Sequence, residues 1–327
     1  MTRLATPSGA RLSAPWQLAD DALMSRTPVT IVAGFLGAGK TTLIRRMLAA
    51  PEERLAVLVN DFAAINVDAA LIESSAPDRI ALTNGCVCCT LRTDLLAATL
   101  ELTEAIPPPE RIVVETSGVA EPYGVMEAFL MPEALERVFV DSAICVVDAL
   151  EFPRLDYASG ELAIDQAATC DIVLLNKCDL VGEEDIRSVE RVLHGALPAM
   201  RIHRTVGAAV PTLVLFGNQH RSLANGTHRH PDYASFAWCA DRPIELPAFR
   251  AIVETLPHGV LRAKGVLRFV ERPDERAVFQ LVGKRSSLEF EAVEPGQSSL
   301  VMIGPKATFD LPTVRGLVMS LGGYEVD

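Results

Sequence analysis

Three segments of the sequence carry residue types and spacings that could do chemistry, and the first is rich in glycine. The stretch GFLGAGKTT, residues 34–42, matches the pattern G-x-x-x-x-G-K-S/T, with an extra glycine at Gly37. Glycines let the backbone wrap closely enough for its N–H groups to point at phosphate oxygens. A helix that starts there adds its positive end. Lys40 would reach the β- and γ-phosphates and the Thr41 hydroxyl would bind Mg²⁺, so the stretch predicts a phosphate-binding loop.

The second segment is NKCD, residues 176–179, at the end of another apolar run. The Asp179 carboxylate can accept hydrogen bonds from the ring N–H and the exocyclic amine of guanine, a donor pair that adenine does not offer. Lys177 would pack its stem along the base. A four-letter match is weak alone, and a capped helix start is the alternative. Together with the phosphate loop it favours GTP as the nucleotide.

Acidic residues between these two motifs could complete a magnesium site. Glu115 ends the apolar run in VVETSG, where a carboxylate can hold the Mg²⁺ water shell, and the Gly118 N–H can sense the γ-phosphate. In NDFAAINVD, residues 60–68, Asp61 and Asp68 are candidate ligands for Mg²⁺, another metal or the attacking water. A solvated acidic loop is the alternative for both. The expected catalytic residues are Lys40, Thr41, Glu115 and Asp61.

The third segment is NGCVCC, which places Cys86, Cys88 and Cys89 at a turn after a short apolar run. Adjacent Cys88 and Cys89 cannot easily bridge each other and a disulfide from Cys86 to Cys88 would be strained, whereas thiolates are soft ligands that suit Zn²⁺ or Cu(I). Three protein ligands with one open position are typical of a site that exchanges its metal. A buried turn or a redox-sensing thiol cluster is the alternative. His228 and His230 are candidate accessory ligands, and mobile surface histidines explain them equally well.

The elements that must position these residues alternate along the first two thirds of the chain. Short runs rich in Val and Ile are separated by segments with helical spacing, which predicts an α/β domain with a mostly parallel sheet, helices on both faces and ligands at the carboxyl ends of the strands. The expected strands are 28–34, 54–61, 111–118, 142–150 and 171–180. A smaller α+β domain should follow. The predicted boundaries are a lead-in at 1–26, a nucleotide domain at 27–216, a His-containing linker at 217–243 and a C-terminal domain at 244–327.

Composition narrows the class of protein. The chain has 327 residues and a formal net charge of −12, which argues against general binding to nucleic acid or to an anionic membrane. The N-terminus has no apolar run like that of a signal peptide, and no run of about eighteen apolar residues predicts a membrane span. Seven cysteines without a disulfide framework favour reduced thiols in the cytoplasm.

These segments, in this order, resemble the CobW family of GTP-binding metallochaperones. The segments that carry the resemblance are GFLGAGKTTL, LTNGCVCCTLRTDL, ETSGVAEP, LLNKCDL, the His-bearing linker and LRAKGVLRF. The resemblance implies a GTPase domain and a smaller C-terminal domain. It also implies delivery of a transition metal, commonly zinc, to a client protein. We expect the protein to be a monomer or homodimer. Implied ligands are Gly34, Gly37, Ala38, Gly39, Lys40, Thr41 and Thr42 for phosphates and magnesium, Asn176, Lys177 and Asp179 for guanine, and Cys86, Cys88 and Cys89 for metal.

One departure from the family pattern concerns the loop after the second strand. Family members usually have Asn-Glu-Phe-Gly-Glu, whereas this chain has NDFAA, so Ala64 stands where a carboxylate is usual. Slow hydrolysis without a partner is expected, because no intrinsic arginine finger is evident. Alternatives to zinc delivery are a GTPase switch with a structural zinc or redox-sensing site, and an activator that inserts Co²⁺ or Fe²⁺ into one enzyme.

Overall fold

Six parallel strands form the first of two sheets. The computed structural model describes residues 26–49, 54–59, 90–119, 122–216, 232–292 and 296–326. The strands of the first sheet, in spatial order, are β2 (Leu55–Val59), β3 (Arg111–Glu115), β1 (Thr27–Ala33), β4 (Val138–Asp148), β5 (Ile172–Asn176) and β6 (Arg201–Arg204). All of the paired neighbours run parallel. Parallel strands end at one edge, so the segments after β1, β3 and β5 lie close together.

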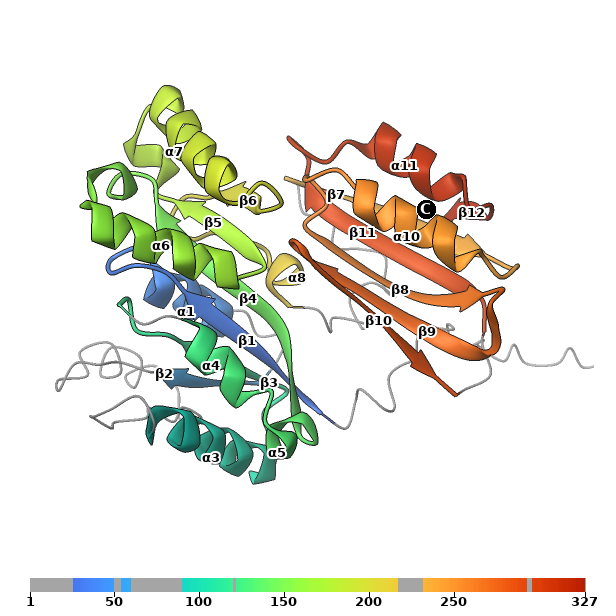
Figure 1. Ribbon diagram of the computed structural model, residues 1–327, viewed down its shortest axis with the longest axis horizontal. Helices are drawn as coiled ribbons and strands as arrows, with labels where there is room; N and C mark the ends of the chain where they lie inside the picture. The colour runs from blue at the N-terminus through green and yellow to red at the C-terminus, as the bar shows by residue number, and fades with distance from the viewer. Residues whose placement is uncertain are drawn as a thin grey trace, which may run out of the picture.

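Helices cover one face of this sheet and part of the other. The helices on the first face are α3 (Thr90–Glu104), α4 (Pro122–Ala128), α5 (Pro132–Leu135), α6 (Tyr157–Thr169) and α7 (Glu183–Ala196). On the opposite face lie α1 (Lys40–Ala49) and the short α8 (Thr212–Leu215). Figure 1 shows α4, α6 and α7 in front of the sheet and α1 behind it. None of the helices in the described part of the chain is long and apolar enough to cross a membrane.

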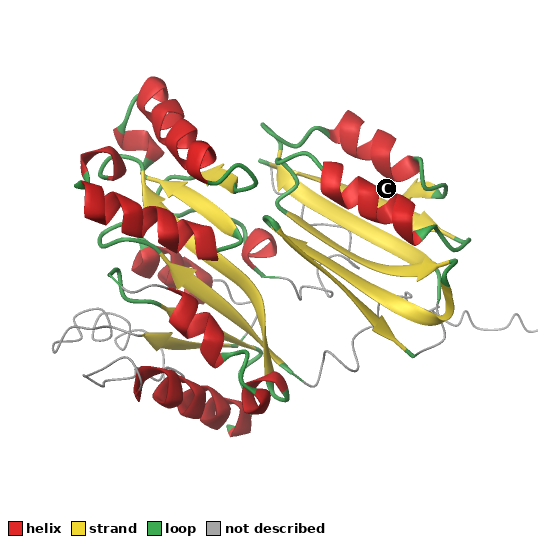
Figure 2. Ribbon diagram, viewed as in Figure 1, coloured by secondary structure: helices red, strands yellow, loops and turns green. Residues whose placement is uncertain are grey.

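The second sheet is antiparallel and also has six strands. Their spatial order is β10 (Arg285–Glu291), β9 (Arg272–Val282), β8 (Arg262–Phe269), β11 (Ser298–Pro305), β7 (Tyr233–Ala240) and β12 (Tyr324–Val326). Two helices, α10 (Leu246–Thr255) and α11 (Leu311–Met319), cover one face of this sheet (Figure 2). They pack with Phe249, Ile252, Val314 and Val318 against the buried side chains of the strands, which include Trp238 and Phe279. This packing gives the second sheet a core of its own.

The predicted fold class is confirmed: a parallel six-stranded sheet with helices on both faces is followed by a smaller α+β unit. The linker predicted at 217–243 differs from the structure at its end, because Tyr233–Ala240 forms β7 and pairs with both β11 and β12. Strand β6 was not expected, since Arg201–Arg204 is a short polar run. Strands β6 and β7 are stabilised by pairing with strands that are distant in sequence, and local sequence patterns do not reveal such pairing.

The second sheet completes the face of the first sheet that α1 leaves open. Leu261, Val282 and Ile303 come from the second unit and belong to the same buried cluster as the α1 side chains and the strand residues Ile144 and Ile172. The short helix α8 lies between the two sheets (Figure 1). Apolar strand residues that a helix would normally cover are thus covered by another sheet. The two units share one core at this boundary, which we call the seam.

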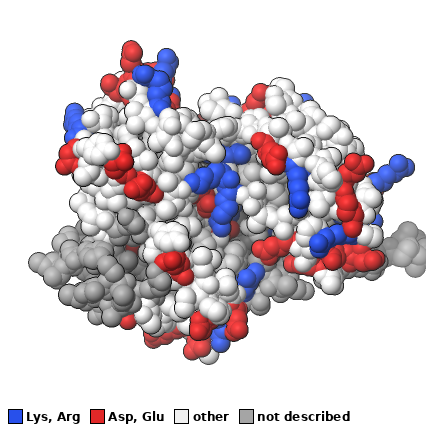
Figure 3. All heavy atoms as spheres, in the orientation of Figure 1, with Lys and Arg blue, Asp and Glu red and all other residues white. Residues whose placement is uncertain are grey.

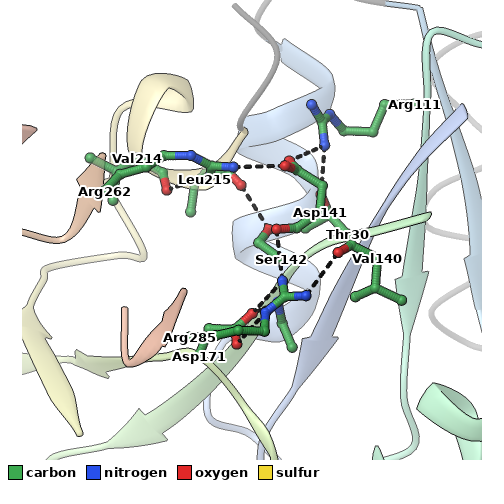
Figure 4. Close-up of polar contacts among 11 residues, drawn as sticks. Thr30, Arg111, Val140, Asp141, Ser142, Asp171, Val214, Leu215, Arg262 and Arg285 are labelled. Atoms are coloured by element: carbon green, nitrogen blue, oxygen red, sulfur yellow. Dashed lines mark hydrogen bonds and ion pairs between the residues drawn. The ribbon is translucent and has the colours of Figure 1, made fainter. Parts of the chain in front are cut away.

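Ion pairs cross the seam around two buried carboxylates (Figure 4). Asp141 on β4 is fully buried and accepts hydrogen bonds from Arg111 on β3 at 2.7 Å and from Arg262 on β8 at 2.8 Å. Asp171, just before β5, accepts two hydrogen bonds from Arg285 at the start of β10. Burial raises the pKa of the Asp171 carboxyl, and the Arg285 guanidinium opposes that shift. On the face drawn in Figure 3, basic side chains gather in the middle, where the two sheets meet.

A variant of Arg262 measures how strongly these pairs hold the seam. Arg262→Met leaves Asp141 buried with one of its two guanidinium partners, so we expect a loss of about 3 kcal/mol in unfolding free energy. Urea denaturation at neutral pH measures it. The control is Arg154→Met, whose exposed pair with Glu151 should be worth less than about 0.5 kcal/mol. Equal effects of the two substitutions would contradict a structural role for the buried pair.

Acid should weaken the seam at His203. The Tyr233 hydroxyl lies 2.7 Å from His203 Nε2, so β6 and β7 share a hydrogen bond, and burial lowers the pKa of His203 to about 4. Unfolded histidine has a pKa near 6.5. Between about pH 6.5 and pH 4 the unfolded chain therefore binds more protons than the folded protein, so the unfolding free energy decreases as the pH is lowered. Since the residue is only partly buried, we expect His203 to account for about 1 to 2 kcal/mol between pH 7 and pH 5.

The matched variants are His203→Gln and His258→Gln. Glutamine keeps a hydrogen-bonding side chain at residue 203 but does not titrate, so this variant should lose less stability on acidification than the wild-type protein. His258 is exposed, and its replacement should leave the wild-type pH dependence in place. Urea unfolding at pH 7 and pH 5 gives the change in unfolding free energy with pH for each protein. If His203→Gln and the wild-type protein respond to acid alike, the titration lies elsewhere.

Candidate functional site

The glycine-rich loop lies between β1 and α1. At two of its positions only glycine fits, because a side chain would clash with neighbouring atoms. Gly34 has φ +136°, and a Cβ atom there would lie 2.1 Å from the Val146 carbonyl oxygen. Gly39 has φ +113°, and its Cβ would lie 2.4 Å from Asn176 Nδ2. Gly37 also has a positive φ, +73°, but open space around it. The loop is therefore shaped by the close approach of β4 and Asn176.

Lys40 begins α1 and lies across this loop. Its ammonium donates to the carbonyl oxygens of Gly34 at 2.9 Å and Phe35 at 3.2 Å, and the residue is only 8% exposed. The first turn of a helix has N–H groups without intrahelical partners, which face any anion held at that end. A lysine at this position adds a full positive charge to the same spot. The arrangement suits a polyphosphate.

Thr41 and Glu115 meet beside the loop. Thr41 Oγ1 donates to Glu115 Oε1 at 3.1 Å, which joins the first turn of α1 to the end of β3. Both residues line a pocket of about 280 Å³, together with Gly37, Lys40 and Gly118. Magnesium prefers oxygen ligands, and a hydroxyl and a carboxylate at this separation are donors that it accepts. The residues present therefore fit Mg²⁺ beside a phosphate.

Asn176, which ends β5, forms hydrogen bonds to two loops, the phosphate loop and the loop 205–209. Its Nδ2 donates to the Ala38 carbonyl oxygen at 2.9 Å, and its Oδ1 accepts from the Ala208 N–H at 2.8 Å. The side chain is buried, so both hydrogen bonds form away from water and are costly to lose. The phosphate loop and the NKCD motif, 176–179, are thus joined. The motif itself lies outside the residues that line the 280 Å³ pocket.

Lys177 is held in an unusual conformation by an acidic partner. It has φ +62° and ψ +31°, the left-handed region that non-glycine residues seldom adopt. Its ammonium pairs with Asp148 Oδ2 at 2.6 Å, while Asp148 Oδ1 accepts the N–H groups of Leu150 and Glu151. Asp179 follows in the short 3₁₀ helix Cys178–Leu180 and is exposed. The lysine stem is therefore fixed, and the Asp179 carboxylate is accessible.

Sequence patterns did not reveal two parts of this arrangement. Asp148 ends the apolar run of β4, where an acidic residue could have been recognised as a partner for Lys177. The loop 205–209 includes Gly207 and Ala208, both with positive φ, and Gly207 accepts a hydrogen bond from Arg46 on α1 at 2.6 Å. Small residues after a strand were the available signal. Ala208 binds Asn176, so this loop belongs to the same site.

Several predicted residues lie outside the described part of the chain. They are Asp61, Asp68, Cys86, Cys88, Cys89, His228 and His230, together with Ala64. The remaining predicted residues all lie at the carboxyl edge of the first sheet: Gly34, Gly37, Ala38, Gly39, Lys40, Thr41, Thr42, Glu115, Gly118, Asn176, Lys177 and Asp179. Within the described ranges, no group of three His, Cys, Asp or Glu side chains could hold a metal ion. Cys145 and Cys170 are buried there, whereas Cys178 and Cys239 are partly exposed.

Two family domains match the chain. The nucleotide-binding domain of the CobW/HypB/UreG family matches residues 28–204. The C-terminal domain of the cobalamin synthesis protein cobW matches residues 233–314. The two matches correspond to the parallel sheet and the antiparallel sheet.

Curated relatives cover most of the chain. The zinc chaperone CobW of Pseudomonas aeruginosa is 33% identical, over 86% of this chain and 88% of that protein. The zinc chaperone YjiA of Escherichia coli is 28% identical, over 86% and 95%. The zinc-regulated GTPase metalloprotein activator 1 of Dictyostelium discoideum is 27% identical, over 80% and 67%. The crystal structure of the Zn(II)-bound YjiA GTPase from E. coli aligns with a TM-score of 0.46 at 23% identity, over 90% of this chain and 99% of that one.

Two glycines of the phosphate loop provide a matched test of its geometry. Gly39→Ala would force a methyl group against the Asn176 amide and strain the backbone, so we expect a loss of at least about 2 kcal/mol in unfolding free energy. Gly37→Ala meets no neighbour and should cost about 1 kcal/mol through its positive φ alone. Chemical denaturation without nucleotide compares them. If Gly37→Ala loses more unfolding free energy than Gly39→Ala, the close contact between Gly39 and Asn176 does not shape the loop.

Proposed function

The chain belongs to the CobW/HypB/UreG family of nucleotide-binding proteins, and on that premise we propose that it is a GTP-dependent metallochaperone that binds zinc and delivers it to a client protein. The observation that carries the nucleotide part is the Thr41 to Glu115 contact beside Lys40 in one pocket. A hydroxyl, a carboxylate and an ammonium converge at the start of a helix. Such a set binds a magnesium-bound polyphosphate better than any neutral ligand.

This geometry supports a specific role for each residue of the pocket. Backbone N–H groups of Gly34–Thr42 bind the phosphates, and Lys40 pairs with the β- and γ-phosphates. Thr41 and Glu115 would hold Mg²⁺, which when bound would offset the charge of the phosphate oxygens. Gly118 lines the same pocket, where its N–H can contact the γ-phosphate. Asp61 remains a candidate for positioning the attacking water.

Guanine is the base that the second motif favours. Asp179 is exposed and can accept two hydrogen bonds from guanine, while Lys177 is held by Asp148 with its stem available to the base. Asn176 would act mainly by joining the base loop to the phosphate loop. No arginine is among the described residues that line the pocket, which supports slow hydrolysis in the absence of a partner.

Zinc is the proposed cargo. Relatives that cover most of this chain are named zinc chaperones, and another is named a zinc-regulated GTPase metalloprotein activator. Cys86, Cys88 and Cys89 supply soft thiolate ligands of the kind that zinc prefers. The thiolates would bind the ion in one nucleotide state and release it in the other. Reciprocity then requires that GTP and zinc change each other's affinity by the same factor.

A zinc titration in two nucleotide states tests this proposal. The zinc affinity is measured against a competing chelator with a magnesium-bound, non-hydrolysable GTP analogue and then with GDP. We expect the two affinities to differ by roughly 5- to 150-fold, the usual range of coupling between sites. Titrating the GTP analogue with and without zinc should give the same factor. Equal zinc affinities in the two states would overturn the coupling.

Two cysteine variants are the controls. Replacing Cys86, Cys88 and Cys89 together with serine should abolish zinc binding and leave GTP binding in place. Cys239→Ser changes a thiol of β7 in the second sheet and should alter neither. The wild-type protein should also hydrolyse GTP in preference to ATP. Failure of the wild-type protein to bind GTP would refute the nucleotide part directly.

A further inference from the structure

Gly118 lies between the phosphate loop and helix α6. Just after β3, Thr116 donates its N–H to the Val32 carbonyl oxygen at 2.9 Å. Two residues later, a Cβ atom on Gly118 would lie 2.9 Å from the backbone nitrogen of Leu36, so the two backbones touch. On its other side Gly118 meets Gln166. The position of this glycine therefore depends on what holds it once the chain has left the sheet.

Gln166 supplies that contact from α6. Its Nε2 donates to the Gly118 carbonyl oxygen at 3.2 Å, and the side chain is fully buried. A carbonyl oxygen only accepts hydrogen bonds, so the amide nitrogen of Gln166 must face it. Because the site is buried, loss of this donor would leave the Gly118 carbonyl oxygen without its hydrogen bond, at a cost in free energy comparable to that of the hydrogen bond itself. The Gly118 peptide is thus directed toward α6 by one specific side chain.

Helix α6 is itself held firmly at both ends. At its start, Asp156 caps the helix by accepting the Ser159 N–H at 2.8 Å. At its end, the turn between β9 and β10 docks on it: Lys284 donates to the Ala168 carbonyl oxygen, and Arg285 pairs with Asp171. Gly283 approaches so closely that a Cβ atom would lie 1.7 Å from the Asp171 carbonyl oxygen. Figure 1 shows the end of α6 directed toward the second sheet, consistent with these contacts.

From this geometry we propose that Gln166 is a positioning residue for the γ-phosphate. It holds Gly118 against the phosphate loop, in the lining of the pocket that contains Lys40 and Thr41, before the nucleotide arrives. A loop that is already in place loses less conformational entropy when the ligand binds. GDP has no γ-phosphate and gains little from this. Gln166 therefore favours GTP over GDP, a role that rests on the proposed GTP function.

The test compares Gln166→Met with the wild-type protein. Methionine keeps nearly the same volume but cannot donate a hydrogen bond. We expect the affinity for a magnesium-bound, non-hydrolysable GTP analogue to fall about 2- to 10-fold, as for the loss of one hydrogen bond, with less change for GDP. A structural defect alone would weaken both nucleotides alike. An unchanged ratio of the two affinities, or a ratio shifted toward GTP, would overturn the role of Gln166.

A matched control separates this effect from general destabilisation. Thr99 is also fully buried on a helix, and its hydroxyl donates to the Leu95 carbonyl oxygen within α3. Thr99→Val should reduce stability without changing the ratio of GTP-analogue to GDP affinity. If the wild-type protein binds no GTP, the proposed function fails. If it binds GTP and Gln166→Met keeps the wild-type ratio, only the role of Gln166 fails.

Hydrogen exchange on the wild-type protein gives a second measurement that does not depend on a variant. The amides of residues 116–119 should exchange more slowly when the GTP analogue is bound than when GDP is bound. The amides of α6 around Gln166 should show the same difference. The physical reason is that a γ-phosphate at Gly118 adds a partner to a segment already joined to α6. Equal exchange at residues 116–119 in both nucleotide states would contradict the proposal.

Discussion

One buried carboxylate fixes how the two sheets of this protein meet. Asp141 is fully buried, and a charge in that position is tolerated only if it is paired. Arg111 comes from the first sheet and Arg262 from the second, so the pairing is complete only when the two are docked. Replacing such pairs with apolar residues is often neutral for stability, so we infer that the pairs at Asp141 act by specifying one docked arrangement. The apolar contacts of Leu261, Val282 and Ile303 then supply the buried area.

The same strand, β4, contributes to the seam and to the candidate nucleotide site at different points along its length. Asp141 lies near the start of β4 and Asp148 at its end, seven residues later, roughly 23 Å along an extended strand. Asp148 orients Lys177, and Asp171 receives Arg285 from the second sheet. Helix α6 connects these regions by a second route, because its end contacts the β9 to β10 turn and its buried Gln166 contacts Gly118. The second sheet therefore supports the walls of the candidate nucleotide pocket without contributing a described residue to its lining.

The parts of this structure that could be predicted from sequence are those whose chemistry is local. A glycine-rich loop before a lysine and a threonine requires a certain backbone, so Gly34, Lys40 and Thr41 lie where their spacing places them. The buried strands were evident from continuous apolar runs. Strand β7 was not, because its alternating burial is set by β11 and β12 and it follows a Gly- and His-rich stretch. Asp141, Asp148 and Gln166 also escaped prediction, since their partners are brought near only by tertiary packing.

The proposed function requires that two metal ions with different ligand preferences be kept apart. Thr41 and Glu115 offer hard oxygen donors for magnesium, whereas Cys86, Cys88 and Cys89 offer soft sulfur donors. Ligand chemistry alone would then limit exchange of the ions between the sites, so any coupling must be conformational. The chain leaves the described part of the first sheet at Val59, which pairs with Glu115 in the β2 to β3 ladder. Ala64 follows shortly after, where the family pattern usually has a carboxylate. Because that position cannot supply a ligand here, nucleotide-dependent changes in zinc affinity would have to come from moving the thiolates themselves or from a ligand elsewhere in the chain.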